Sequence, residues 1–321
     1  MQQIEIFAPD FDLAMTLDSG QVFHWAKAGD GFVGLIGKRP IYVEQSGDVL
    51  KASGEVVKPD RLDPSSLGSI VSDYFALDHP LAKICASFPK DPAMNAARDF
   101  CGGLRIIRQP KWECLATFIC SSMKQVAHIR QISAKLRERF GEGRTVAPEV
   151  KADGGSAARS TNRHVIYAFP TAERIAAASE KELRGCSLGY RAKNLLATAR
   201  QIASDDADLE KLAEASDVDL RARLCKLPGV GAKVANCVML FAYERLRAFP
   251  IDVWIERVLR QRYFPRARKL NAARLRRFTE EYFGHHGGYA QQYLFHHARK
   301  TKSESTGKSN RKMGSLSQFR G

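Results

Sequence analysis

The stretch Leu224-Cys225-Lys226-Leu227-Pro228-Gly229-Val230-Gly231-Ala232-Lys233-Val234-Ala235 decides how the second half of the chain folds. A helical pattern over residues 218–226 precedes it, and Pro228 ends that helix because proline lacks a backbone N–H. Gly229 and Gly231 supply the permissive backbone angles of a tight turn. Apolar residues then recur at spacings of three and four as far as about Tyr243. The stretch therefore predicts two helices joined by a turn over residues 225–235, called the hairpin below.

The hairpin is suited to binding an anion. Its glycines let the backbone approach a ligand closely, and the second helix presents unpaired N–H groups at its positive end. Gly229, Val230 and Gly231 would therefore bind a phosphate without reading any base. An ordinary helix connection is the alternative, and the flanking Leu227, the central Val230 and the charge of the chain disfavour it. The backbone carbonyls of Cys225, Leu227 and Val230 could also hold a structural monovalent cation.

The net charge favours a polyanionic partner. Fifty Lys plus Arg against thirty-five Asp plus Glu leave +15 on 321 residues, while 44% hydrophobic content excludes wholesale disorder. No run approaches the ~18 apolar residues that span a bilayer, and no basic amphipathic helix with a broad apolar face stands out. The N-terminal segment Met1–Asp10 has no signal-peptide pattern. We expect a monomeric intracellular protein of the cytoplasm or nucleoid (the nucleus in a eukaryote), not secreted and not bound to a membrane.

The seven cysteines predict neither disulfides nor a metal centre. They are odd in number, scattered, and contain no Cys-x-x-Cys pair. We therefore expect most of them to be small buried apolar side chains. The sequence predicts no cofactor and no metal site with side-chain ligands, apart from the cation at the hairpin.

Residues 1–104 predict a strand-rich N-terminal domain. The β-prone runs Gln21–Trp25, Phe32–Ile36 and Pro40–Val43 are separated by turn residues, which favours an antiparallel sheet. Helical patterns follow over residues 65–77 and 92–100.

Residues 105–300 predict an all-helical domain, so the fold class is α+β. Apolar residues recur at helical spacing from Trp112 onward, and Thr171 is typical of a helix N-cap. A loop is expected over residues 153–160, and residues 301–321 read as a basic disordered tail. The expected helices include those over residues 126–136, 180–185, 192–204 and 218–226.

Lys233 and Asp252 are the candidate catalytic residues. Lys233 falls in the first turn of the second helix, whose positive end would lower the pKa of its amine. That helix rises about 15–16 Å to Tyr243 at ~1.5 Å per residue, and the link to Ile251 can span about 26–29 Å. The chain can therefore return and place Asp252 beside Lys233. An amine nucleophile next to a carboxylate suits attack on a sugar carbon, with Schiff-base formation. Taken alone, a lysine at such a position is most often a solvated surface residue, and the aspartate an N-cap.

Leu227–Ala235 together with Pro250–Val253 resembles the helix-hairpin-helix (HhH-GPD) DNA glycosylase superfamily and, within it, the 8-oxoguanine DNA glycosylase/AP lyase family. The four-cysteine cluster of the iron–sulfur branches is missing. The resemblance runs over most of the chain except the tail, through the segments 19–25, 74–78, 103–109, 113–122, 188–192 and 290–295.

The resemblance implies base flipping in damaged duplex DNA, with Lys233 as nucleophile at C1′ and Asp252 as essential carboxylate. It also implies a set of residues that bind the flipped base. Gly34 would accept a hydrogen bond from the N7–H of 8-oxoguanine, Phe295 and Cys237 would cover the two faces, and Gln291 would read the Watson–Crick edge. Core packing, a surface amide and a turn glycine are the ordinary alternatives for these four.

The chain departs from the family pattern at several positions. Met123 stands where eukaryotic members carry a base-reading asparagine, and His128 follows further on. Tyr190 keeps the aromatic wedge, and Arg191 keeps one cation near the vacated stack. We therefore expect relaxed discrimination of the base opposite the lesion. Trp254 replaces a histidine that the family often has two residues after the aspartate.

A basic run closely follows Asp252, and some of its charge is expected to track a duplex backbone. Two other functions stay open: an HhH glycosylase for another damaged base, and a non-catalytic HhH DNA-binding protein. The run comprises Arg257, Arg260, Arg262, Arg266, Arg268, Lys269, Arg274, Arg276 and Arg277.

Overall fold

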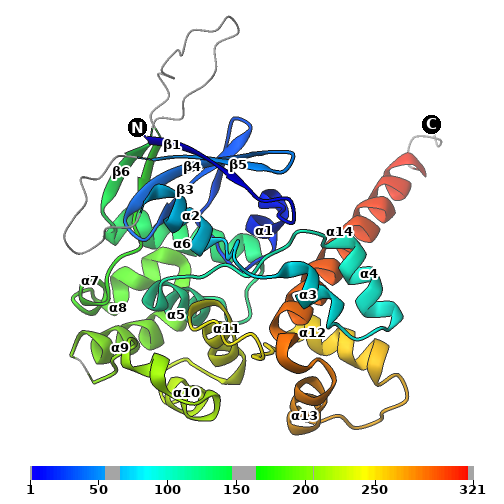
Figure 1. The fold of residues 1–321 in the computed structure, drawn as a ribbon. Coiled ribbons are helices and arrows are strands. Elements are labelled where there is room, and N and C mark those ends of the chain that lie inside the picture. Colours follow the sequence, from blue (N-terminus) through cyan, green and yellow to red (C-terminus); the bar gives the residue numbers. More distant parts are fainter. Residues whose placement is uncertain (1, 55–65, 147–163, 205, 317–321) are drawn as a thin grey trace, which may run out of the picture.

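The computed structural model describes residues 2–54, 66–146, 164–204 and 206–316. An antiparallel sheet lies above a helical body (Figure 1), which confirms the α+β class. The described strands of the sheet follow the order β1-β5-β4-β3-β2. Their bounds are β1 Gln2–Phe7, β2 Ala26–Ala28, β3 Gly31–Ile36, β4 Arg39–Ser46 and β5 Val49–Gly54.

The sheet buries one apolar core against helix α2 (Leu67–Tyr74). Ile41, Val43 and Leu50 are fully buried there and contact Val71 and neighbouring side chains of that helix. Strands β3 and β4 pair with Gly34 opposite Ile41. The predicted runs Phe32–Ile36 and Pro40–Val43 are therefore confirmed as neighbouring strands.

The prediction of a strand over Gln21–Trp25 is wrong. This segment has no regular secondary structure, and a short strand begins only at Ala26. The buried amide of Gln21 explains the difference. Its Nε2 donates to the carbonyl of Arg105 (2.7 Å), and its Oε1 accepts from the N–H of Ile107 (2.8 Å). These side-chain hydrogen bonds fix the position of the segment, which therefore forms no backbone ladder with a neighbouring strand.

The helical body confirms the expected periodicity, and Thr171 caps α7 by accepting from the N–H of Arg174. A second, two-stranded sheet pairs β6 (Gly143–Val146) with β7 (His164–Tyr167). The predicted loop at 153–160 lies outside the described residues. The remaining α-helices are α1 Leu13–Asp18, α3 Leu81–Ala86, α4 Pro92–Phe100, α5 Lys111–Cys120, α6 Val126–Phe140, α7 Ala172–Ala176, α8 Glu180–Leu183, α9 Arg191–Ala203, α10 Asp217–Leu224, α11 Ala232–Ala242, α12 Val253–Val258, α13 Ala272–Tyr282 and α14 Gly287–Leu316. Two π-helices, η1 Arg184–Leu188 and η3 Leu259–Tyr263, and two 3-10 helices, η2 Lys211–Glu214 and η4 Gly284–His286, complete the described helical elements.

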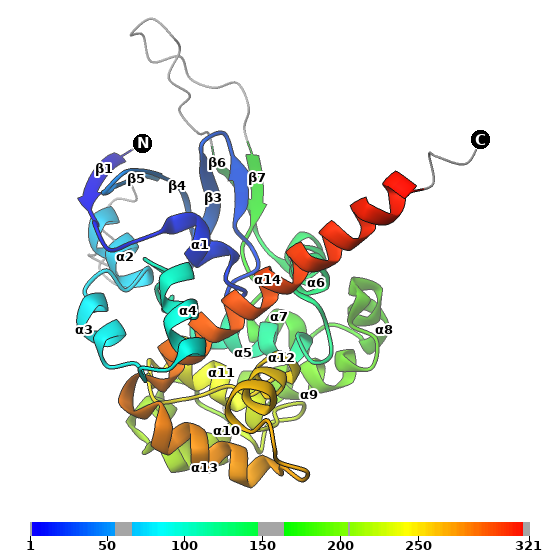
Figure 2. The same cartoon turned by 90° about the vertical axis from the view of Figure 1, so that its right-hand side faces the viewer.

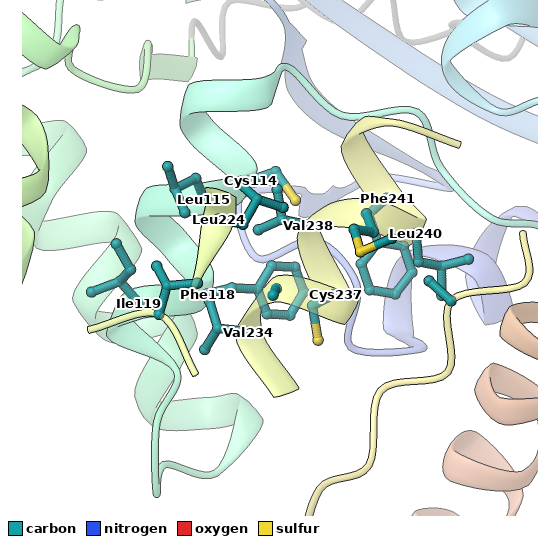
Figure 3. Close-up of a cluster of buried hydrophobic side chains, with 14 of the residues drawn as sticks. Cys114, Leu115, Phe118, Ile119, Leu224, Val234, Cys237, Val238, Leu240 and Phe241 are labelled. Atoms are coloured by element: carbon teal, nitrogen blue, oxygen red, sulfur yellow. The ribbon is translucent and has the colours of Figure 1, made fainter. Parts of the chain in front are cut away.

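The core of the helical body is centred on the packing of α5 against α11 (Figure 3). Phe118 of α5 stacks on Phe241 of α11 with ring centroids 5.4 Å apart. Helices α3 and α4 share this core through Ile84 and Met94, although they precede the predicted domain boundary at residue 104. The boundary itself stays a prediction.

Helix α14 replaces the predicted disordered tail as far as Leu316. It projects beyond the body as one continuous helix (Figure 2). The segment 301–316 contains no proline, so nothing in its backbone stops the helix that residues 287–300 begin. Residues 317–321 lie outside the described part.

The cysteines are free thiols, as predicted. Five are buried, Cys85 is half-buried and Cys225 is exposed. In the part of the chain that the structure describes, no helix is long and apolar enough to cross a bilayer.

Candidate active site

The hairpin adopts the tight turn that its glycines predict. Gly229 has φ +82°, and a Cβ there would lie 2.8 Å from the Cβ of Asn194 on α9. Glycine is therefore required by both the backbone angle and the close approach of α9. Thr198 of the same helix donates to the carbonyl of Pro228 at 2.8 Å. These contacts fix the turn against α9.

Gly231 presents the start of α11 to solvent. It is the exposed N-cap residue of that helix, and a Cβ there would meet no atom within 4 Å. Val230 between the two glycines is buried and anchors the turn in the core. The first N–H groups of α11 thus face an open approach, as an anion site requires.

The three carbonyls predicted to hold a cation all lie in this turn. That of Leu227 accepts from the N–H of Val230 at 3.1 Å. Those of Cys225 and Val230 accept no hydrogen bond from any residue that the structure describes. Within the described residues no cluster of His, Cys, Asp or Glu side chains could hold a metal ion. Carbonyl oxygens with free lone pairs suit an alkali cation, so the donor set fits such an ion.

Lys233 is half-buried in the first turn of α11 and points toward α5. Its Nζ donates to the Oγ of Ser121 at 3.0 Å and lies 5.1 Å from the ring centroid of Phe118. The hydroxyl of Ser121 in turn donates to the carbonyl of Phe118 at 2.7 Å. Ser121 therefore orients the amine, a role that the sequence did not assign.

Asp252 caps helix α12, and the charge of Lys233 acts on its carboxylate. Its Oδ1 accepts from the N–H groups of Trp254 (3.0 Å) and Ile255 (2.9 Å). Burial raises the pKa of Asp252, while the hydrogen bond from Ile255 and the charge of Lys233 oppose that rise. Both backbone bonds use Oδ1, so Oδ2 is available to a substrate. The predicted catalytic pairing of the carboxylate with the amine stays a prediction, because only the charge of Lys233 links the two side chains.

Cys237 lies one turn after Lys233 on the buried side of α11 (Figure 3). Burial raises the pKa of its thiol to about 11, the charge of Lys233 opposes the rise, and the charge of Asp252 adds to it. The thiol is therefore neutral at physiological pH. The three side chains form one electrostatic group at the start of α11.

The predicted base-binding residues Gln291 and Phe295 lie on α14, one turn apart. Gln291 is 4% exposed, and its Oε1 has no hydrogen-bond partner in the described part of the protein. A buried unpaired carbonyl is costly, so its presence marks a position that a ligand can satisfy. Gln292 between them donates to the carbonyl of Ser19 at 2.9 Å and ties α14 to the loop after α1.

The glycine that lies beside Phe295 is Gly20 rather than the predicted Gly34. A Cβ on Gly20, at φ +88°, would lie 3.2 Å from the Cε1 of Phe295. Gly34 instead lies inside the sheet, where a Cβ would meet the indole of Trp25 at 2.4 Å. Trp25 is held there by a hydrogen bond from its Nε1 to the hydroxyl of Tyr74 (3.0 Å). Gly34 is thus a packing glycine beneath an indole.

Two predicted DNA-binding side chains project from the surface. Met123, in the turn after α5, is 93% exposed and has φ +54°, and Tyr190 before α9 is 56% exposed. His128 on α6 is also exposed. A non-glycine residue with positive φ is uncommon, so the turn holds Met123 in an outward, strained position.

Arg191 is buried rather than free to contact a base. Its Nε donates to the carbonyl of Ser122 at 2.8 Å, and its Nη1 donates to that of Leu188 at 3.3 Å. Its guanidinium also lies 4.4 Å from the ring centroid of Tyr190. Arg191 therefore supports the Met123 turn and Tyr190 from below.

The structure places the amine of Lys233 directly after the glycine turn, the carboxylate of Asp252 at the start of α12, and the unpartnered amide oxygen of Gln291 on α14. Sequence reasoning missed Ser121 and Gly20. Both residues lie inside segments that resemble the family, Glu113–Ser122 and Ser19–Trp25, so the resemblance was the sequence signal that could have identified them.

Two family models together match residues 3–282 of the chain. Residues 3–115 match the family described as 8-oxoguanine DNA glycosylase, N-terminal domain, and residues 116–282 match the family described as HhH-GPD superfamily base excision DNA repair protein.

Curated proteins with similar sequences include two that match most of this chain. The chain is 27% identical over 318 residues to a probable N-glycosylase/DNA lyase of Methanothermobacter thermautotrophicus, covering 91% of this chain and 95% of that protein. It is 29% identical to the N-glycosylase/DNA lyase OGG1 of Arabidopsis thaliana, covering 89% of this chain and 77% of the relative.

Solved structures with the same fold include complexes with DNA. MBOgg1 bound to a low affinity DNA ligand is 30% identical, with a TM-score of 0.80 over 94% of this chain and 97% of its own. The Clostridium acetobutylicum 8-oxoguanine glycosylase/lyase, bound to duplex DNA with cytosine opposite 8-oxoguanine, is 27% identical, with a TM-score of 0.79 over 94% and 99%.

Proposed function

The chain belongs to the HhH-GPD superfamily of base excision DNA repair proteins and is an N-glycosylase and DNA lyase, and from this premise we propose that it excises 8-oxoguanine from duplex DNA. The observation that carries the proposal is the half-buried amine of Lys233 in the first turn of α11, beside the hairpin, where its charge also acts on the half-buried carboxylate of Asp252. A DNA-binding module without catalysis has no need of a half-buried amine at this position.

Catalysis uses the amine as nucleophile. The lone pair of the Lys233 Nζ attacks C1′ of the flipped nucleotide, and the C1′–N9 bond breaks with its electrons going to the base. The carboxylate of Asp252 stabilises the positive charge that develops on the sugar. Opening of the ring then gives a Schiff base between Nζ and C1′. Removal of a proton from C2′ expels the 3′-phosphate by β-elimination, which is the lyase step.

Recognition of the base uses the loop after α1 and one face of α14. Gly20 lies beside Phe295, and its carbonyl accepts no hydrogen bond from the described residues. It can accept from the N7–H of 8-oxoguanine, a donor that guanine lacks. With guanine in the pocket this carbonyl would stay unpaired, so the contact supplies about 1–3 kcal/mol of discrimination against guanine. Gln291 contributes its free Oε1 to the Watson–Crick edge, while Phe295 and Cys237 cover the faces of the base.

The vacated position in the duplex is filled by Met123 and Tyr190. Both are exposed and can pack against bases, but neither offers the fork of donors that would select cytosine. Arg191 does not supply this fork, because its guanidinium is used by backbone carbonyls. We therefore infer weak discrimination of the opposite base.

The hairpin binds the backbone of the same strand through the N–H groups at Gly229, Val230 and Gly231. A monovalent cation held by the carbonyls of Cys225, Leu227 and Val230 would add positive charge at this phosphate. Soluble duplex DNA, not a membrane, is the partner.

A lesion panel tests the substrate. Single-turnover excision is measured on matched duplexes that carry 8-oxoguanine, guanine or 3-methyladenine at one site. We expect cleavage of the first alone. Gln291→Ala should slow excision of 8-oxoguanine, yet still nick a preformed abasic site, because Lys233 remains. Preferred excision of 3-methyladenine would overturn the substrate while leaving the enzyme class intact.

A further inference from the structure

Eight exposed cations follow the catalytic carboxylate along α12, η3, the loop after it and α13. Residues 253–282 carry nine Lys plus Arg against three Asp plus Glu, which is +6 of the +15 on the whole chain. We call the exposed members the basic surface: Arg257, Arg262, Arg266, Arg268, Lys269, Arg274, Arg276 and Arg277.

The basic surface is not neutralised by the protein. None of its eight side chains forms an ion pair with any carboxylate in the described ranges. Two of the segment's three acids are already used, since Glu256 pairs with Arg260 (2.8 Å) and Glu280 pairs with Arg221 (3.3 Å). Exposed arginines elsewhere often have partners, such as Arg184 with Glu180 at 2.7 Å. Unpaired like charges at this density repel one another, so they are explained best by a ligand that brings negative charge.

Aromatic packing holds parts of this surface in place. The guanidinium of Arg257 lies 5.6 Å from the ring centroid of Trp254, and that of Arg274 lies 5.3 Å from that of Phe264. The buried Leu259 fixes the backbone beneath η3. These contacts reduce the freedom of long side chains and so lower the entropy cost of binding a ligand.

The basic surface adjoins both parts of the active site. It begins five residues after Asp252, on the helix that Asp252 caps. At its other side, burial and the charge of Arg262 lower the pKa of His297, which lies two residues beyond Phe295 on α14. In Figures 1 and 2, α12 and α13 lie next to each other and a loop connects them at the outside of the body.

We propose that the basic surface binds phosphates of the duplex that flank the lesion, beyond those bound by the hairpin. The inference rests on the proposed function, because a glycosylase already holds duplex DNA at Asp252. The surface contributes affinity independent of sequence and lengthens the DNA footprint. It does not touch the reacting atoms.

The test is the salt dependence of binding to undamaged DNA, which does not require excision. The variant replaces Arg262, Arg266, Arg268 and Lys269 by alanine. A control replaces Lys27, Lys38, Lys83 and Lys211, which are exposed elsewhere, and so removes the same charge. Dissociation constants are measured over a range of salt on a duplex of about two helical turns and on one of about one turn.

Each lost phosphate contact lowers the slope of log Kd against log salt by about 0.9. We expect the variant to lose about 2 to 3 from the slope on the longer duplex, and much less on the shorter one. Replacing the three arginines by lysine should keep the slope, because the charge stays. Unfolding midpoints check that each variant is folded.

A slope equal to that of the wild-type protein would overturn the proposal. An equal loss in the control would also overturn it, because the effect would then come from net charge rather than this surface. An inactive enzyme with the expected slopes would refute the proposed substrate but not the surface.

Discussion

Replacing Gly229 by alanine should break the hairpin while the neighbouring Gly231 tolerates the same change. At φ +82° a residue with a Cβ costs about 1–2 kcal/mol relative to an ordinary backbone. The new Cβ would also lie 2.8 Å from the Cβ of Asn194, and overpacking of this kind costs about 1–3 kcal/mol. Gly229→Ala should therefore lower the free energy of unfolding by about 2–5 kcal/mol.

Gly231 is the matched control for stability. Its φ is −96°, it is exposed, and a Cβ there meets nothing within 4 Å. Because alanine is less favourable than glycine at an N-cap, Gly231→Ala should lower the free energy of unfolding by about 1 kcal/mol or less, which is below the loss expected at Gly229. Urea unfolding followed by circular dichroism measures both variants. Equal stability losses in the two would refute the claim that α9 and the left-handed angle dictate Gly229.

The same substitution should weaken DNA binding. If the turn moves away from Asn194, its N–H groups no longer point at one phosphate. Loss of one hydrogen bond to a charged group, worth about 1.5–3 kcal/mol, corresponds to roughly a 10- to 100-fold higher Kd. Fluorescence anisotropy with an undamaged duplex checks this, and unchanged affinity in a folded Gly229→Ala protein would contradict the assignment of the hairpin as a phosphate site.

Three further predictions concern the chemistry and its specificity. Burial raises the pKa of Asp252, so the ionised carboxylate destabilises the folded state above that pKa. Asp252→Asn should therefore raise the unfolding temperature at neutral pH, and this gain should disappear in acid. A lower unfolding temperature of the variant at neutral pH would contradict the raised pKa. The rate of excision should fall on acidification at a higher pH than an exposed aspartate would give. Ser121→Ala removes the hydroxyl that accepts a hydrogen bond from the Lys233 amine. Loss of a hydrogen bond worth about 0.5–1.5 kcal/mol should slow single-turnover excision about 2- to 10-fold. An unchanged rate would show that Ser121 does not orient the amine. Because Met123 lacks base-reading donors, excision of 8-oxoguanine opposite C, A, G and T should differ by less than about a hundredfold, a ~2.7 kcal/mol limit that a strong cytosine preference would exceed.

Local signals were sufficient for the hairpin and its catalytic pair. Pro228 and the two glycines define the turn through backbone chemistry alone. The return of the chain from Tyr243 to Asp252 follows from simple lengths of helix and loop. These features depend on few long-range contacts, so sequence reasoning reached them.

The base pocket depends on contacts that no local pattern contains. Gly20 was missed and Gly34 chosen because both are glycines near strands; only the position of α14, far along the chain, places Phe295 against Gly20. Gln21 shows a related limit, since its buried amide overrides the β-propensity of its neighbours. The positive charge of Arg191 predicted a contact with DNA. The sequence does not show that two backbone carbonyls hold its guanidinium in a buried position.

Trapping of a covalent intermediate tests the central claim most directly. Borohydride reduces a Schiff base to a stable amine, so the protein should become linked to a duplex that carries 8-oxoguanine and not to one that carries guanine. Lys233→Gln should abolish the linked species, while Ser121→Ala should still form it at a lower rate. Excision of 8-oxoguanine without any trapped complex, or an adduct that survives in Lys233→Gln, would contradict the assignment of Lys233 as the nucleophile.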